Sequence, residues 1–117
     1  MRKILAAGFI IAATATPTTQ VLAAEIPIPR TMADKGKYYL LDVKTKGSIV
    51  TSRHKRVGVN ETGYSKTEIN CKSMQYRDMG YSEDGPDKIA DSPGTWTNVL
   101  AGSSKSDLVN FVCIRNP

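Results

Sequence analysis

The side chains best suited to chemistry form a basic cluster in the middle of the chain. Its members are Lys44, Lys46, Arg53, Lys55 and Arg56. Guanidinium groups suit carboxylate or sulfate groups, and lysine adds a compact positive charge. We predict that these five residues bind an acidic partner, with Arg53, Lys55 and Arg56 largely exposed. The alternative is a solvated strand face whose lysines discourage edge-to-edge pairing.

The only histidine, His54, lies inside this cluster. Neighbouring positive charge disfavours its protonation, and no carboxylate adjoins it in sequence to orient a general base. The serines form no Gly-x-Ser-x-Gly motif. We therefore predict an exposed strand histidine, no catalytic residue, no cofactor and no enzymatic activity.

An acidic stretch occupies residues 83–91. It contains Glu83, Asp84, Asp87 and Asp91. Calcium takes carboxylate oxygens from flexible loops, but this spacing matches no EF-hand. We predict a solvated acidic loop and no metal site, and calcium binding is the alternative.

The N-terminus has the pattern of an export signal. Arg2 and Lys3 precede an uncharged apolar stretch, residues 4–13, which is too short to span a membrane. We predict cleavage after Ala23, with Ala24 as the next candidate site. No cysteine stands directly after the predicted cleavage site, so the exported protein is not expected to be a lipoprotein. It is expected in the periplasm or secreted.

Cys71 and Cys113 are the only two cysteines of the chain. Two cysteines and one histidine are too few for a structural zinc site, and export favours oxidation. We predict a disulfide between them. Removal of 23 of the 117 residues leaves 94, and a domain of that size gains from a covalent crosslink.

The net charge argues against nucleic acid as a partner. Without Arg2 and Lys3 the chain carries 14 basic and 11 acidic residues, a net charge of +3. Proteins that bind the phosphate backbone of nucleic acid usually carry a larger excess of basic over acidic residues. An acidic protein surface or acidic polymer is the expected partner instead.

The elements that position these residues are mainly strands. The predicted strands are residues 37–43, 48–59, 64–71, 75–81 and, more briefly, 95–100. After Gly102, Ser103 or Ser104 can cap a helix with Leu108 on its apolar face. We predict an α+β fold, a small antiparallel meander of about four to five strands with a C-terminal helix packed on it.

The predicted organisation has four parts. They are a signal peptide (1–23), an extended and mobile N-terminal arm (24–36), a folded domain (37–113) and a C-terminal tail (114–117). The arm contains Pro27 and Pro29 and shows no periodic apolar pattern.

Several short motifs resemble the surface-adhesin protein E family of Gram-negative bacteria. They are Lys37-Tyr38-Tyr39-Leu40-Leu41-Asp42, Glu68-Ile69-Asn70-Cys71, Gln75-Tyr76-Arg77, Pro93-Gly94-Thr95-Trp96, Ala101-Gly102-Ser103 and Val112-Cys113. The resemblance implies an antiparallel sheet, a helix on one face and a disulfide tying the two. It also implies adhesin-like binding of proteins and a capacity to form a homodimer.

The expected function is that of an exported, non-enzymatic binding module of the bacterial cell envelope. The basic residues would contact a host matrix protein or an acidic polymer. The alternative is a periplasmic accessory or inhibitor protein that acts by protein contact within an envelope assembly.

Overall fold

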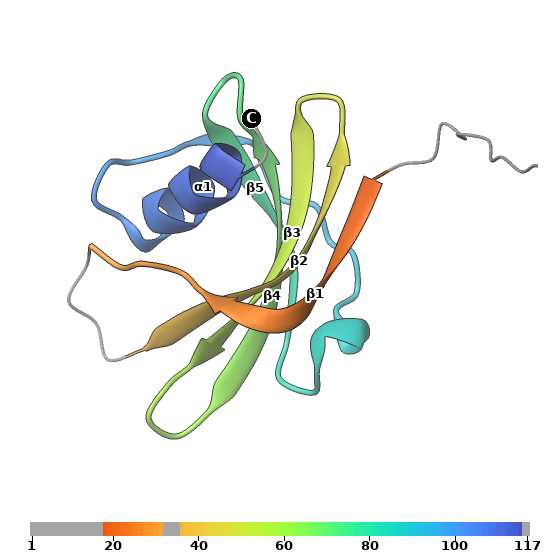
Figure 1. Cartoon of the computed structure of the whole chain (residues 1–117), viewed down its shortest axis with the longest axis vertical. Helices are drawn as coiled ribbons and strands as arrows, with labels where there is room; N and C mark the ends of the chain where they lie inside the picture. The colour runs from red at the N-terminus through yellow and green to blue at the C-terminus, as the bar shows by residue number, and fades with distance from the viewer. Residues whose placement is uncertain (1–17, 32–35, 116–117) are drawn as a thin grey trace, which may run out of the picture.

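The computed structural model describes residues 18–31 and 36–115, with side chains from Glu25 onward (Figure 1). Its elements are β1 (Thr18–Pro27), β2 (Lys37–Lys46), β3 (Ile49–Val57), β4 (Thr62–Asn70), β5 (Gln75–Ser82), the short 3-10 helix η1 (Pro86–Lys88), β6 (Thr97–Asn98) and α1 (Ser104–Arg115). Residues 1–17 of the predicted signal peptide, 32–35 of the predicted arm and 116–117 of the predicted tail lie outside the described residues. Residues 18–23 of the predicted signal peptide form the first part of β1, so cleavage after Ala23 would remove that part of the strand.

The strands form one antiparallel sheet in the order β1-β2-β3-β4-β5-β6, with α1 on one face and the loop carrying η1 on the other (Figure 1). Each strand pairs with its sequence neighbour. The connections from β2 to β5 are short, as in a meander, whereas residues 83–96 separate β5 from β6. Gly47 has a φ of 62° in the β2–β3 turn, a conformation that glycine adopts without steric cost. The predicted α+β meander with a C-terminal helix is confirmed.

The segment before Lys37 differs from the predicted mobile arm. β1 pairs with β2, and the backbone N–H of Ile28 donates to the Tyr38 carbonyl at 2.9 Å. Ile28 is buried, whereas the neighbouring prolines point to solvent. This alternation is a strand pattern that the prolines obscured in the sequence. Proline is acceptable here because β1 is an edge strand, where a missing N–H breaks no central ladder.

The core lies between the sheet and α1. Leu40, Val50 and Ile69 from the sheet meet Val109 and Val112 from the helix, and all five are almost inaccessible to solvent. Full burial of one such side chain contributes roughly 1.5 to 3 kcal/mol, so this small set is the main apolar stabilisation. Among residues 18–31 and 36–115 no helix has the length and apolar character needed to cross a membrane.

The last turn of α1 is bonded to the sheet by the Cys71–Cys113 disulfide, which confirms the predicted bridge. Cys71 follows β4 directly, and the two Cα atoms are 5.5 Å apart across a sequence separation of 42 residues. In the chain-entropy description, such a crosslink removes about 4 kcal/mol of denatured-state entropy.

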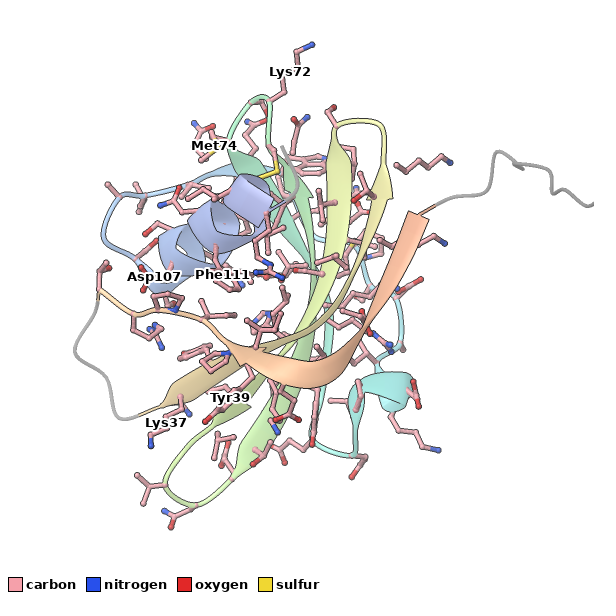
Figure 2. The ribbon with its side chains drawn as sticks, in the orientation of Figure 1. Lys37, Tyr39, Lys72, Met74, Asp107 and Phe111 are labelled. Atoms are coloured by element: carbon pink, nitrogen blue, oxygen red, sulfur yellow. A yellow bond between two sulfur atoms is a disulfide. The ribbon has the colours of Figure 1, made fainter. Side chains whose placement is uncertain are left out.

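The first turn of α1 is attached by a second set of contacts. The Asp107 carboxylate accepts hydrogen bonds from the Thr31 hydroxyl at 2.8 Å, the Thr31 backbone N–H at 3.1 Å and Arg30 Nε at 3.2 Å. Asp107 is only 7% exposed and lies on the side of α1 that faces the segment after β1 (Figure 2). Burial opposes its ionisation, but the bonds from Thr31 and Arg30 outweigh it, so the Asp107 pKa is below its ordinary value.

Removal of the disulfide is expected to destabilise the domain strongly. The Cys71→Ser, Cys113→Ser double variant should lose roughly 2 to 5 kcal/mol of unfolding free energy in urea denaturation, because its denatured state is less constrained. Reductant should weaken the wild type to the same level and leave the variant unchanged. Equal midpoints for oxidised and reduced wild type would contradict this role.

The Asp107→Asn substitution keeps the side-chain shape but removes the charge that accepts these bonds. We expect a loss of about 2 kcal/mol at pH 7, measured by urea denaturation. Because the folded-state pKa is depressed, this contribution is present above about pH 4 and disappears as the pH falls through the folded pKa. The exposed Asp84→Asn is the control, and a loss of similar size there would contradict the assignment.

Candidate functional site

The two faces of β3 divide the predicted basic cluster. Side chains alternate between the faces of a strand, so Arg53 and Lys55 point away from α1. His54 and Arg56 point toward it and line a space that residues of α1 also line. The five predicted binding residues therefore do not form a single surface.

Arg53 and Lys55 are engaged in ion pairs and are not largely exposed. Arg53 Nε donates to the two oxygens of Asp42 at 3.0 and 2.9 Å, and Arg53 Nη1 lies 3.2 Å from Asp87. Lys55 Nζ lies 2.6 Å from Glu25. The two basic side chains are 31% and 16% exposed, so the predicted exposure is wrong. The reason is register, since β2 places Asp42 opposite Arg53 and β1 supplies Glu25.

The face away from α1 carries a shallow hollow of about 460 Å³, which we call the outer hollow. It is lined by Lys44, Lys46, Ile49, Thr51, Glu68, Arg77 and Trp96. Arg77 pairs with Glu68 at 2.7 Å and lies 4.9 Å from the centre of the Trp96 ring. Lys44 and Lys46 are exposed, and neither forms an ion pair with another described residue.

The prediction named Lys44 and Lys46 but missed the rest of the outer hollow. Arg77 and Trp96 come from β5 and from the loop before β6, and only the folded sheet brings them beside the lysines. Trp96 is the only tryptophan of the chain. A single tryptophan was the sequence feature that could have indicated this binding surface, because large aromatic side chains are enriched at interfaces.

The acidic stretch lies against the same face of the sheet. Asp87 contacts Arg53, and Asp91 lies 2.6 Å from Lys66. In the part of the chain that the structure describes, no group of three or more His, Cys, Asp or Glu side chains could hold a metal ion. Asp87 and Asp91 thus act as partners for basic groups of the sheet.

The face toward α1 holds a second space of about 190 Å³, which we call the inner cavity. Its polar lining includes Tyr38, His54, Arg56, Ser65, Ser104 and Lys105. Ile28 and Leu108 supply apolar walls. The cavity therefore lies between the middle strands and the first turn of α1. The Ser103 hydroxyl caps this turn by accepting a hydrogen bond from the Ser106 N–H at 3.1 Å.

His54 is buried in this cavity, contrary to the predicted exposed histidine. It is 6% exposed, and its Nδ1 has no hydrogen-bond partner among the described residues. Burial, followed by the charge of Lys105, lowers the pKa of His54 to about 4, although Asp78 acts in the opposite direction. The physical reason for its position is alternation, since an even-numbered residue of β3 lies on the core face.

Arg56 lies close to two glycines at the edge of the inner cavity. Its Nε donates to the Tyr38 hydroxyl at 3.1 Å. A Cβ atom on Gly36 would lie 2.6 Å from Arg56 Nε, and one on Gly58 would lie 2.7 Å from Nη1. Both contacts are with the end of a flexible side chain, so a larger residue at either position would displace the Arg56 guanidinium group from the edge of the inner cavity.

The pKa of His54 predicts a specific pH dependence of stability. Because the folded pKa is lowered from 6.5 to about 4, the unfolded chain takes up the proton first, and stability falls as pH falls through this range. The loss should approach about 3 kcal/mol at pH 4. In His54→Gln, urea denaturation should show a weaker dependence between pH 6.5 and 4. Identical slopes in both proteins would contradict a buried neutral histidine.

Comparison of the chain with family models, with curated proteins and with solved structures found no match.

Proposed function

We propose that this protein is an exported, non-enzymatic binding module of the bacterial cell envelope, and that the outer hollow binds an acidic protein or acidic polymer. The observation that carries the proposal is the position of Lys44 and Lys46. They are exposed beside Trp96, while other basic groups of the same face have carboxylate partners. Two basic groups without such partners attract an incoming carboxylate more strongly than neutralised ones do.

The chemistry of the hollow supports contact with an extended acidic segment. Ile49 and Trp96 offer apolar area beside the lysines, and buried aromatic groups contribute disproportionately to binding. Glu68 also lines the hollow, but Arg77 neutralises it at 2.7 Å. The positive charges of Lys44 and Lys46 are therefore not offset by the carboxylate that lines the outer hollow.

Adhesin-like display is part of the proposal. It is supported by the export pattern of residues 1–23 and by the motif resemblance to the surface-adhesin protein E family. In intact cells, antibody binding to the native protein is expected for a displayed adhesin. Complete protection of the protein until the outer membrane is opened would favour the alternative, a periplasmic accessory protein with the same binding surface.

Reversal of the charges of Lys44 and Lys46 should weaken binding of an acidic polymer without lowering the stability of the domain. For the Lys44→Glu, Lys46→Glu double variant we expect at least about tenfold weaker binding of poly-glutamate. Binding is measured at low salt through the quenching of Trp96 fluorescence. Thermal stability should change little, since an exposed substitution usually costs within about 0.5 kcal/mol. Added salt should weaken binding by the wild type, because it screens exposed charges.

The matched control is Lys37→Glu, Lys72→Glu. It makes the same change in net charge at two exposed lysines that lie at opposite ends of the molecule (Figure 2). Equal loss in the control would show that binding follows net charge alone, and unchanged binding by the Lys44, Lys46 variant would place the contact surface elsewhere.

A further inference from the structure

The edge strand β1 consists of two paired halves with an irregular stretch between them. Residues 18–21 pair with residues 42–45 of β2, and residues 26–27 pair farther along the same strand. Residues 22–25 have no partner in this register. The predicted cleavage site after Ala23 lies in this irregular stretch. Cleavage there would therefore remove one paired half as a unit and leave the other in place.

The half of β1 that cleavage would leave is anchored independently of residues 18–21. Ile28 is buried in the core, and its backbone N–H donates to the Tyr38 carbonyl at 2.9 Å. Glu25 is held by its ion pair with a lysine of β3. Loss of residues 18–21 is therefore expected to open β2 at residues 42–45 and to leave the rest of this edge covered.

An open stretch of β2 has backbone groups without partners. Every second residue of an antiparallel strand directs its N–H and C=O toward the neighbour on one side, so removal of residues 18–21 frees these groups on alternate residues of 42–45. Such an edge is a template for another strand. Pro27 and Pro29 blunt the retained half because proline has no N–H, and the opposite edge of the sheet is the two-residue strand β6. Residues 42–45 are therefore the best place for strand addition along the described sheet.

The side chains at this edge indicate the chemistry of the added strand. Lys44 and Lys46 are exposed and line the outer hollow, and neither forms an ion pair with another described residue. Val43, between them and residue 42, is buried in the core beneath α1. Opposite charges across a strand pair are stabilising and like charges are destabilising. A strand with acidic residues at alternate positions would place carboxylates beside both lysines on one face.

The uncleaved chain shows that this edge accepts an extended strand, since its own residues 18–21 are paired there. A second copy of the cleaved chain is a less suitable occupant. It would bring its own Lys44 and Lys46 to the same seam, and four positive charges along one seam oppose the pairing. Charge complementarity therefore favours an acidic partner strand.

We propose that export opens the edge of β2 at residues 42–45, and that this edge binds an extended acidic segment of a partner protein by strand addition. The added strand lies where residues 18–21 lie in the uncleaved chain, and its alternate acidic side chains contact Lys44 and Lys46. Backbone hydrogen bonds supply affinity, and the two lysines select the acidic residues. The strand-addition site rests on the proposed function, because export and the acidic partner come from it.

Three peptides of equal charge test this site on protein that is exported with its own signal peptide and purified from the periplasm, its N-terminus determined by mass spectrometry. The first peptide has seven residues that alternate threonine and glutamate, with both ends blocked. The second has the same composition with its glutamates adjacent, and the third is the first peptide with N-methyl groups on its backbone nitrogens. In NMR titrations the first should bind at least about tenfold more tightly than the others, because only it combines alternating charge with free backbone N–H groups. It should also slow hydrogen exchange at amides of residues 42–45.

Charge reversal should exchange the preference between peptides. The Lys44→Glu, Lys46→Glu variant should lose the threonine–glutamate peptide and bind the alternating threonine–lysine peptide instead. The matched control Lys37→Glu, Lys72→Glu should keep the preference of the wild type. The uncleaved chain of 117 residues, produced without export and oxidised to form the disulfide, should bind the threonine–glutamate peptide at least about tenfold more weakly, because residues 18–21 occupy the edge.

Several outcomes would overturn strand addition. They are an exported protein that keeps residues 18–21, a dimer whose amides at 42–45 are protected without peptide, and no binding of the alternating peptide by about 10 mM. Equal binding of the three peptides, or equal binding by the uncleaved chain, would also overturn it. Poly-glutamate separates these results from failure of the proposed function, since binding that depends on Lys44 and Lys46 would leave the outer hollow as the site. Loss of poly-glutamate binding as well would overturn both.

Discussion

The structure depends on keeping a short helix, half of whose residues are polar, on the sheet. An isolated helix of 12 residues is marginal in water, and only one side of α1 supplies buried apolar groups. Two attachments at opposite ends compensate for this. The Cys71–Cys113 disulfide bonds the last turn to the end of β4, and Asp107 binds the first turn to Arg30 and Thr31. Both the apolar core and the inner cavity lie under the helix that these attachments hold.

Strand alternation then places basic residues in two different electrostatic environments. On the outer face, Lys44 and Lys46 are exposed to water. Their electrostatic attraction for an anion extends into the solvent, but added salt screens it. In the inner cavity, His54 is removed from water and is neutral at pH 7, so hydrogen-bond geometry matters more than net charge. One basic stretch of sequence thus serves two unlike surfaces.

Much of the fold could be predicted because it follows local patterns. Alternating apolar residues indicated the strands from Lys37 to Ser82, and serine before an apolar stripe indicated where α1 begins. The disulfide followed from composition and the export pattern. β1 was missed because residues 18–23 were assigned to the signal peptide and because Pro27 and Pro29 mask the alternation that brings Ile28, just after the strand, into the core. Edge strands tolerate proline, so local propensity alone misjudged this segment.

The sequence by itself determined the strand order of a short-loop meander, the cysteine pair and the identity of the basic residues. Only the tertiary structure decided what those residues do. Arg53 meets Asp42 across a strand pair, and Trp96, from a distant loop, lines the same hollow as Lys44. Asp107 becomes buried because the segment after β1 covers it. Exposure and ion pairing depend on contacts between residues far apart in the chain, and no local pattern specifies those contacts.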